Sequence, residues 1–236
     1  AQHPEKKAVF FGIGFETTTP AVALAVVEAQ RRGMRNFYLL SVHKLIPPAL
    51  RALLDGGEVA VDGFLLPGHV SAIIGAEPYL FLAERYGLPA VIAGFEPLDI
   101  LQSIHMLVQQ VSEGRAAVEI QYRRVVRPEG NRRAQEVMRE VLTPADVFWR
   151  GLGAIPASGL CLRDAYLQFD AERVLDLDVS YSREPGGCGC GEVLRGVRIP
   201  FDCTLFGTVC SPEQPVGPCM VSSEGTCYAY YQFGRQ

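Results

Sequence analysis

Six cysteines packed into the last fifth of this 236-residue sequence are its clearest chemical signal. They are Cys188, Cys190, Cys203, Cys210, Cys219 and Cys227, spaced C-x-C-x12-C-x6-C-x8-C-x7-C. Thiolates bind metals, and paired thiols exchange electrons by opening and closing a disulfide. The segment therefore predicts one of three things: a disulfide framework, a zinc site, or an iron–sulfur cluster with two cysteines to spare.

Chain length and spacing separate these three interpretations. A chain of this size buries a hydrophobic core without cross-links, so a small disulfide scaffold is disfavoured. Zinc sites usually draw on C-x2-C pairs, and the segment contains none. Iron–sulfur clusters bind four thiolates at looser spacing, beside glycine and proline that let backbone N–H groups approach sulfur. The nearby residues of this kind are Gly186, Gly187, Gly189, Gly191, Pro212, Gly217 and Pro218. We therefore favour a cluster, although spacing leaves open which four cysteines bind it.

The overall composition excludes several classes of function. The formal net charge is -4 and no basic block occurs, which argues against binding to nucleic acid or to a membrane surface. No apolar run is long enough to span a bilayer. The first residues, "AQHPEKKAVFF", lack the pattern of a signal peptide and start like a fragment at a domain boundary. We expect a cytoplasmic protein, whose clustered cysteines bind metal more often than they form bridges.

The first half of the chain alternates apolar runs with helical patterns. The strand candidates are residues 8–15, 37–43, 63–69 and 89–95. The expected helices run from an N-cap at Thr19 to Gly33, and over residues 47–56, 76–86 and 97–113. The last of these carries Leu101, Ile104, Val108 and Val111 on one face. The alternation predicts an α/β fold with a parallel sheet covered by helices on both faces.

A titratable residue follows each of the four apolar runs. These residues are Glu16, His43, His69 and Glu96, at intervals of 27, 26 and 27. The carboxyl ends of neighbouring parallel strands meet at one edge, where open α/β sheets bind ligands. We therefore expect the four side chains to share one cleft, the alternative being ordinary polar turns. Thr17 and Thr18 either cap the next helix or line the same cleft.

The pattern changes after Gly114, and we expect a domain boundary near residue 115. The first domain is residues 1–115, and the second, residues 116–236, carries the cysteines. In the second domain, residues 116–126 are a candidate outer strand, and Asn131 is expected to cap a helix over residues 132–142.

Other parts of the second domain look less regular. Residues 148–162 hold too much glycine and proline to favour a strand or a helix. Cys161 lies between two leucines and is expected to be a small buried hydrophobe. Regular structure should be sparse after Tyr181.

Common nucleotide and hydrolase motifs are absent. "GIGFET" has threonine where a dinucleotide-binding loop has its third glycine, and neither a phosphate-binding loop nor a Gly-x-Ser-x-Gly elbow occurs.

Several stretches together resemble the HypD-type NiFe-hydrogenase maturation factors. They are "GFETTTP" (14–20), "PGHVS" (67–71), "GFEPLDIL" (94–101), "EGN" (129–131) and the whole cysteine segment. The likeness extends over essentially the entire chain. It implies a scaffold for assembling the iron–dicyanide–carbonyl unit of NiFe hydrogenase, with HypC as partner chaperone and HypE as cyanide donor. It also implies two α/β domains and a third domain that carries a 4Fe–4S cluster.

The resemblance further implies roles for single residues. The cluster ligands are Cys188, Cys203, Cys210 and Cys227, and Cys190 and Cys219 form a redox pair beside the cluster. From its position three residues before Cys227, Glu224 is a candidate proton carrier, with a turn carboxylate as the alternative. From their place at the strand ends, the residues expected to face the guest iron are Glu16, Thr17, Thr18, His69 and Glu96.

Two departures from the family pattern bear on these roles. The family's N-terminal domain, with its Cys-Gly-Thr-His stretch, is not in this sequence, so the cysteine thought to help bind the guest iron is missing. Ile120 stands where the family pattern has asparagine. The alternative function is an electron-transfer or structural iron–sulfur module without assembly chemistry, and a zinc domain that docks partners comes third.

Overall fold

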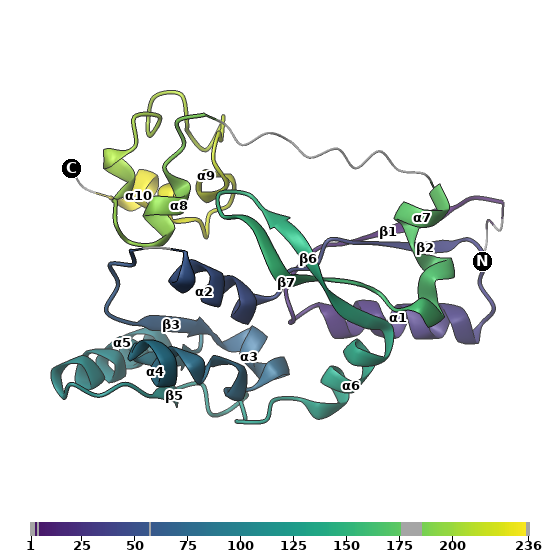
Figure 1. Ribbon diagram of the computed structural model, residues 1–236, viewed down its shortest axis with the longest axis horizontal. Coiled ribbons are helices and arrows are strands. Elements are labelled where there is room, and N and C mark those ends of the chain that lie inside the picture. The colour runs from purple at the N-terminus through teal and green to yellow at the C-terminus, as the bar shows by residue number, and fades with distance from the viewer. Residues whose placement is uncertain (1–2, 4, 57, 176–185, 235–236) are drawn as a thin grey trace. The chain divides into compact units, whose positions relative to one another are not determined.

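The computed structural model describes residues 3, 5–56, 58–175 and 186–234 (Figure 1). Contacts divide the chain into two compact units. We call the first the α/β unit: Ala1–Pro48, Asp62–Ala145 and Ala157–Val179. The second, the cysteine-rich unit, is Ala49–Val61, Asp146–Pro156 and Ser180–Gln236. The expected domain boundary near residue 115 stays a prediction.

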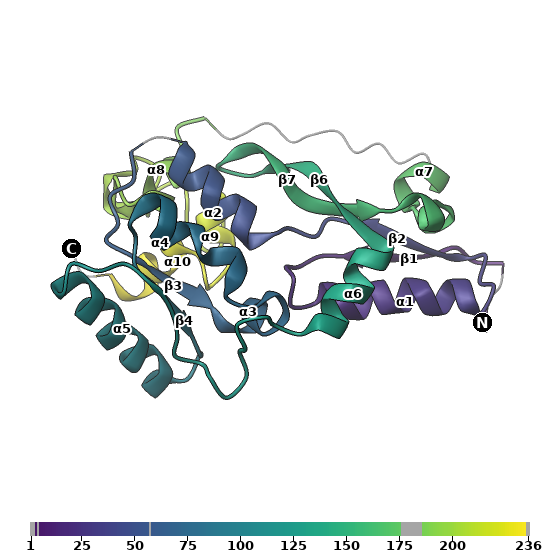
Figure 2. The ribbon, with the colours of Figure 1, turned by 60° about the horizontal axis from the view of Figure 1, so that its bottom comes forward.

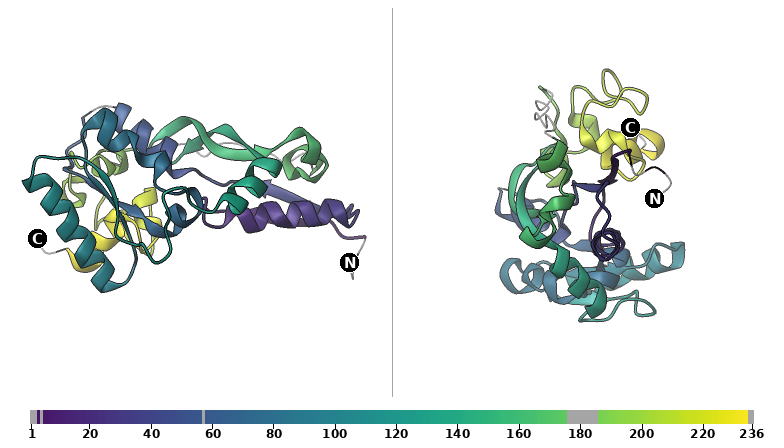
Figure 3. Two further views of the ribbon diagram at one scale, coloured as in Figure 1. Left: turned by 90° about the horizontal axis from the view of Figure 1, so that it is seen from below. Right: turned by 90° about the vertical axis from the view of Figure 1, so that its right-hand side faces the viewer.

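A two-stranded parallel sheet opens the α/β unit. β1 (Ala8–Gly12) pairs with β2 (Phe37–Ser41), and Ala8 lies opposite Phe37. The helix between them, α1 (Thr19–Arg31), has Pro20 in its first turn, and its N-cap is Thr18, one residue before the expected Thr19. α1 runs along this sheet (Figure 3).

A second parallel sheet has the order β3-β4-β5. Its strands are β3 (Phe64–Pro67), β4 (Ala90–Ala93) and β5 (Val118–Ile120). All four residues of the central strand β4 are buried, as continuous apolar runs in parallel sheets predict. The outer strand expected within residues 116–126 is confirmed as β5. The α/β class predicted from the sequence is therefore confirmed.

The helices of this second sheet alternate with its strands along the chain. Those between β3 and β4 are α3 (Gly68–Ile74), a 3-10 turn η1 (Glu77–Tyr79) and α4 (Phe81–Tyr86), and α5 (Pro97–Ser112) follows β4. α5 lies along the sheet in Figure 2. His69 is thus the second residue of a helix instead of the last of a strand.

The expectation that all four runs pair in one sheet is wrong. β1 and β2 form one sheet, and β3 and β4 belong to the other. The regular spacing records the length of a strand–helix repeat. It does not determine which strand edges pair, because pairing depends on packing between distant segments.

α5 buries polar residues and exposes apolar ones. Its buried residues are Asp99, Ser103 and Gln110. Its exposed apolar residues are Leu98, Leu101, Ile104, Val108 and Val111. The amphipathic helix expected over 97–113 therefore forms, but its apolar face is exposed.

A β-hairpin occupies the region where we expected irregular structure. α6 (Arg132–Val141) starts at Asn131, whose side chain accepts a hydrogen bond from the Ala134 N–H at 3.1 Å, which confirms the expected cap. β6 (Leu142–Trp149) and β7 (Gly153–Leu162) follow and pair with each other.

The glycines of this hairpin make its turn instead of breaking its strands. Gly151 and Gly153 have φ angles of +84° and +80°, which glycine adopts at little cost. Cys161 is exposed, so the expectation of burial is wrong: Leu160 and Leu162 are buried, and alternation along the strand turns Cys161 to the opposite face.

The main core of the α/β unit joins α1, β2, the hairpin and the 3-10 segment η2 (Asp164–Phe169). Its most buried members include Val26, Leu39, Val141, Leu142 and Phe169. A short helix, α7 (Ala171–Leu175), follows.

In the described part of its C-terminal segment, residues 186–234, the helices of the cysteine-rich unit are short. They are α8 (Cys190–Leu194), the 3-10 turn η3 (Pro200–Asp202), α9 (Pro218–Val221) and α10 (Thr226–Phe233). Most of α2 (Ile46–Asp55) also belongs to this unit. No helix in the described part of the chain combines the length and apolar character needed to cross a membrane.

Two apolar residues close in sequence should differ sharply in their effect on stability. Ile92 is 0% exposed in the central strand, whereas Leu98 is 75% exposed on α5. Ile92→Ala should lower the free energy of unfolding by about 2–5 kcal/mol, because it removes buried carbon and leaves a cavity. Leu98→Ala should change it by less than about 0.5 kcal/mol. Chemical denaturation of both variants measures the difference, and equal losses would contradict the burial seen here.

Candidate metal centre and strand-end residues

Three thiols from three short helices lie in one buried group. The sulfur atoms of Cys190, Cys219 and Cys227 all lie within 4.8 Å of one another. Each belongs to the first two residues of its helix, and the N-caps of these helices are Gly189, Gly217 and Gly225. At Gly217 the absence of a side chain leaves room for sulfur next to the backbone, and at Gly225 it leaves room for the Cys219 carbonyl.

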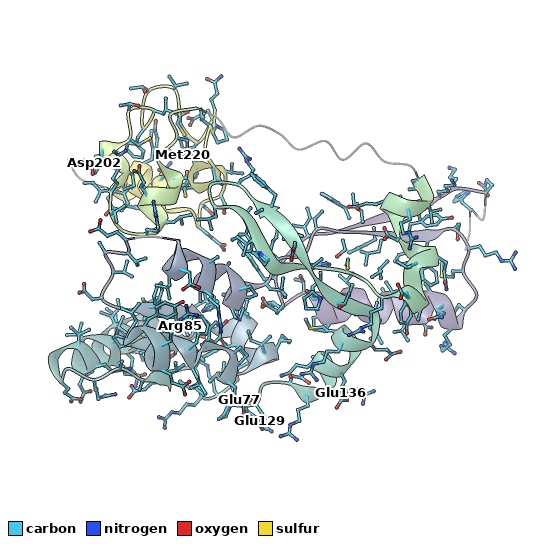
Figure 4. All side chains as sticks on the ribbon, viewed as in Figure 1. Glu77, Arg85, Glu129, Glu136, Asp202 and Met220 are labelled. Carbon is cyan, nitrogen blue, oxygen red and sulfur yellow. The ribbon has the colours of Figure 1, made fainter. Side chains whose placement is uncertain are left out.

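The other cysteines of the segment line a small pocket next to this group. Its cysteine lining is Cys188, Cys190, Cys203, Cys210 and Cys227, and its apolar lining includes Val193, Leu205, Phe206 and Met220. Met220, labelled in Figure 4, is 1% exposed and packs in the same apolar cluster. All four residues expected as cluster ligands thus line one pocket, while Cys219 lies outside its lining.

The backbone around the pocket approaches sulfur closely. A Cβ atom at Gly217 would overlap Cys188 Sγ and lie 2.6 Å from Cys190 Sγ, so only glycine fits there. The Val216 N–H donates to Cys210 Sγ at 3.4 Å. Bonds from N–H groups to sulfur are characteristic of iron–sulfur sites. The donor set and this glycine cradle therefore fit such a cluster.

Hydrogen bonds among the buried thiols shift the pKa values of Cys227 and Cys219 in opposite directions. Hydrogen bonds from Cys190 and Cys219 lower the pKa of Cys227 to about 4, and hydrogen bonds with Cys190 and Cys227 raise the pKa of Cys219. Burial, with the hydrogen bond to Cys190, raises the pKa of Cys188 to about 11. Cys188 Sγ lies 3.2 Å from Cys190 Sγ. The lowered pKa favours the thiolate form of Cys227, which is the form that binds metals.

Glu224 lies in an exposed turn just before this thiolate. Its own N–H donates to Ser222 Oγ at 3.2 Å, and the N–H of Gly225 closes the turn on the Ser222 carbonyl. The carboxylate is thus accessible and three residues from Cys227 in sequence.

The structure brings His69 and Glu96 to the same edge of the β3-β4-β5 sheet. His69 stacks on Phe95 with ring centroids 4.5 Å apart, and its ring lies 6.3 Å from that of Tyr122. Glu96 is the N-cap of α5, and its exposed carboxylate lies 3.4 Å from Arg124 Nη2. Both predicted residues are solvent-accessible.

Glu16 and His43 belong to the other sheet and are buried, so the predicted cleft shared by all four residues is wrong. Glu16 is 2% exposed, and one carboxylate oxygen accepts the Ile46 N–H at 3.0 Å. His43 is 0% exposed and its Nδ1 lies 3.2 Å from Ser41 Oγ. Among the described residues, Glu16 Oε2 and His43 Nε2 have no hydrogen-bond partner.

Thr17 and Thr18 are exposed beside Glu16. The Thr18 hydroxyl donates to the Phe15 carbonyl at 3.3 Å, as expected for a residue at the start of a helix.

Sequence reasoning missed a polar network at the β3-β4-β5 edge. It consists of Asp99, Gln121, Tyr122 and Arg124. The guanidinium of Arg124 is the main cause that lowers the pKa of Asp99 to about 2. Asp99 lies within the "GFEPLDIL" stretch, but periodicity alone places it on a helix and says nothing about its partner.

The fold and the buried thiols together define an α/β protein with a cysteine centre able to bind metal in its C-terminal region. The HypD family model, described as the hydrogenase formation hypA family, matches residues 1–234. The chain belongs to the HypD family.

Similar proteins carry names from hydrogenase maturation. The hydrogenase expression/formation protein HupD of Azotobacter chroococcum is 49% identical over 240 residues, which cover 99% of this chain and 63% of that protein. The hydrogenase maturation factor HypD of Cupriavidus necator is 49% identical over 241 residues, covering 99% and 64%. That of Rhodobacter capsulatus is 49% identical over 238 residues, covering 99% and 63%. The chain thus spans a little under two thirds of the length of these relatives.

The buried Glu16 carboxyl should make stability depend on pH. Burial raises its pKa from 4.5 to about 7, so the folded chain holds this proton more tightly than the unfolded chain. The group therefore favours folding below pH 4.5, and this contribution is lost as pH rises through about 7. Glu16→Gln keeps an oxygen for the Ile46 N–H and removes the titration. Its free energy of unfolding relative to the original chain should rise by up to about 3 kcal/mol between pH 5 and pH 8.

Denaturation curves across this pH range check the effect, with the exposed Glu96→Gln variant as control. Parallel pH profiles for Glu16→Gln and the original chain would contradict a strongly perturbed carboxyl.

Proposed function

We propose that this chain serves in hydrogenase maturation, as scaffold and electron donor for assembly of the Fe(CN)2CO unit of NiFe hydrogenase. The observation that carries the proposal is that five cysteines line one small pocket, and that the sulfur of the sixth, Cys219, lies within 4.8 Å of the sulfur atoms of Cys190 and Cys227. Four thiols are enough for a cluster, and two remain beside it. Membership of the HypD family and the names of the relatives support the same role.

In this proposal Cys188, Cys203, Cys210 and Cys227 hold a 4Fe–4S cluster. All four line one pocket, and the lowered pKa of Cys227 favours its thiolate form. When bound, such a cluster supplies single electrons at a potential set by hydrogen bonds to sulfur and by burial. The Val216 N–H, already directed at Cys210 Sγ, is one such bond.

Cys190 and Cys219 act as the redox dithiol. Their sulfur atoms lie within 4.8 Å of each other, close enough for a modest side-chain rotation to join them. Closing this disulfide breaks two S–H bonds and releases two electrons and two protons. Release of cyanide from a sulfur carrier requires the same numbers of electrons and protons. A thiocyanate takes up two electrons and two protons and yields a thiol and hydrogen cyanide. Glu224 is the proposed proton carrier, because it is accessible and next to Cys227 in sequence.

The cyanide donor and the iron carrier are proposed to be a HypE-type protein and a HypC-type chaperone. His69 and Glu96 are the residues proposed to contact the guest iron unit, because both are exposed at one sheet edge. Glu16, Thr17 and Thr18 lie at the β1-β2 sheet and are proposed to support the site from there.

Cluster content should distinguish the four ligands from the dithiol. Replacing Cys188, Cys203, Cys210 or Cys227 by alanine should cause loss of iron and labile sulfide, because an iron is left without its thiolate. Cys190→Ala and Cys219→Ala are the matched controls and should retain both. Anaerobic preparations assayed for iron, sulfide and absorption spectrum provide the measurement. A Cys190 variant without a cluster beside a Cys188 variant with a full one would reverse the assignment within the C-x-C pair.

Thiol counting should detect the dithiol. With the cluster intact, mild oxidation should remove two reactive thiols that a reductant restores, and Cys219→Ser should abolish the change. In the complete protein, the same variant should block hydrogenase maturation while keeping its cluster. An unchanged thiol count together with normal maturation would favour the alternative, a cluster module without assembly chemistry.

A further inference from the structure

Tyr122 fills the junction between the ends of two neighbouring strands. Gly68 follows β3 and Gly94 follows β4. A Cβ atom on Gly68 would lie 2.8 Å from Tyr122 Cδ1, and one on Gly94 would lie 2.7 Å from Tyr122 Cδ2. A Cβ atom on Gly68 would also overlap the Ala93 carbonyl oxygen, and one on Gly94 would overlap Asp99 Oδ2, so both positions require glycine and the ring adds to that requirement. The tyrosine ring therefore bridges the two strand ends that precede His69 and Phe95.

A bidentate ion pair braces this ring. Arg124 Nη1 donates to Asp99 Oδ1 at 2.8 Å, and Nη2 donates to Oδ2. The guanidinium carbon lies 4.5 Å from the centre of the Tyr122 ring. The Asp99 side chain is only 6% exposed, so its carboxylate gives Arg124 one fixed position. A guanidinium held over an aromatic face adds a cation–π attraction that keeps the ring in place.

Gln121 connects the same segment to the strand end. Its side-chain oxygen accepts the Gly94 N–H at 3.2 Å, and its Nε2 donates to Asp99 Oδ1 at 2.9 Å. The residues after β5 are thus bonded to the end of β4 and to the first turn of α5. In this network Asp99 and Arg124 pair with each other, Arg124 Nη2 also lies 3.4 Å from the Glu96 carboxylate, and the Tyr122 ring neighbours both the guanidinium and the His69 ring.

We propose that Tyr122 is a positioning residue for His69, and that the Asp99–Arg124 ion pair acts on His69 through Tyr122. The His69 imidazole stacks on Phe95 at 27° and 4.5 Å, and Tyr122 lies on another side at 60° and 6.3 Å. Two aromatic rings thus restrict an otherwise exposed imidazole to one orientation. The importance of this orientation rests on the proposed function, in which His69 contacts the guest iron unit. The positioning itself does not.

Side-chain NMR of the histidines tests the positioning directly. The chain has four histidines, so His3, His43 and His105 are internal references for His69. Tyr122→Ala should shift and broaden the ring signals of His69, because its neighbouring ring current and its restriction are lost. Tyr122→Phe keeps the ring and should restore the original signals. Unchanged His69 signals in Tyr122→Ala, or equal shifts of all four histidines, would overturn the proposal.

A double-mutant comparison tests the route through Tyr122. Arg124 is an exposed side chain, so Arg124→Gln should leave the fold intact and shift the His69 signals less than Tyr122→Ala does. In the Tyr122→Ala background, Arg124→Gln should add no further shift. An additional shift of similar size would mean that Arg124 acts on His69 independently, which contradicts the proposal.

Maturation in the complete protein separates this proposal from the proposed function. Tyr122→Ala should reduce maturation on the order of tenfold or more, since a displaced reacting group loses that much, and Tyr122→Phe should retain it. His69→Ala is the reference. If His69→Ala leaves maturation unchanged, the proposed role of His69 fails, whereas the NMR result still decides whether Tyr122 positions it. Normal maturation by Tyr122→Ala beside a defective His69→Ala would contradict the positioning role.

Discussion

The close approach of buried sulfur to the backbone is the constraint on which the cysteine-rich unit depends. Thiols that are to bind one metal must converge, although here they lie on short helices and turns instead of strands or long helices. Gly217 provides room for the sulfur atoms of Cys188 and Cys190, and Gly225 provides room for the carbonyl of Cys219. Apolar residues such as Met220 then exclude water around the thiols, which strengthens every electrostatic interaction among them. The short helices and the glycine-rich sequence are therefore consequences of the site.

The same physical device recurs at the strand ends of the α/β unit. Gly68 and Gly94 leave space that a tyrosine ring occupies, and an ion pair fixes that ring. At both sites a glycine on one segment leaves room for a functional or supporting group from another segment. These contacts are between residues far apart in sequence, and a single added carbon would prevent them. The family motifs Pro-Gly-His and Gly-Phe-Glu thus each contain a glycine with a packing role and a titratable residue beside it.

The titratable residues of the α/β unit fall into two different environments. Glu16 and His43 are buried, and burial shifts both toward their neutral forms. His69 and Glu96 are exposed, so they are the ones available to a guest or a partner. In the proposed maturation role these four residues therefore have different tasks, although each of them follows a strand. The buried pair supports the structure near α2, and the exposed pair offers ligand or proton-transfer chemistry.

The sequence by itself determined the α/β class and the N-cap at Asn131, and it predicted a metal or redox site in the cysteine segment, because these follow from local periodicity, capping and spacing. The likeness to the HypD family, seen in short motifs, was also available from the sequence and is confirmed. Only the tertiary structure decided that β1 and β2 pair apart from β3 and β4, since equal repeats fit either arrangement. It also decided that the glycines near residue 151 form a hairpin turn, and that Cys161 faces outward. Likewise, the partner of Asp99 is an arginine 25 positions further on, and no local pattern encodes which distant side chain will neutralise a buried carboxylate.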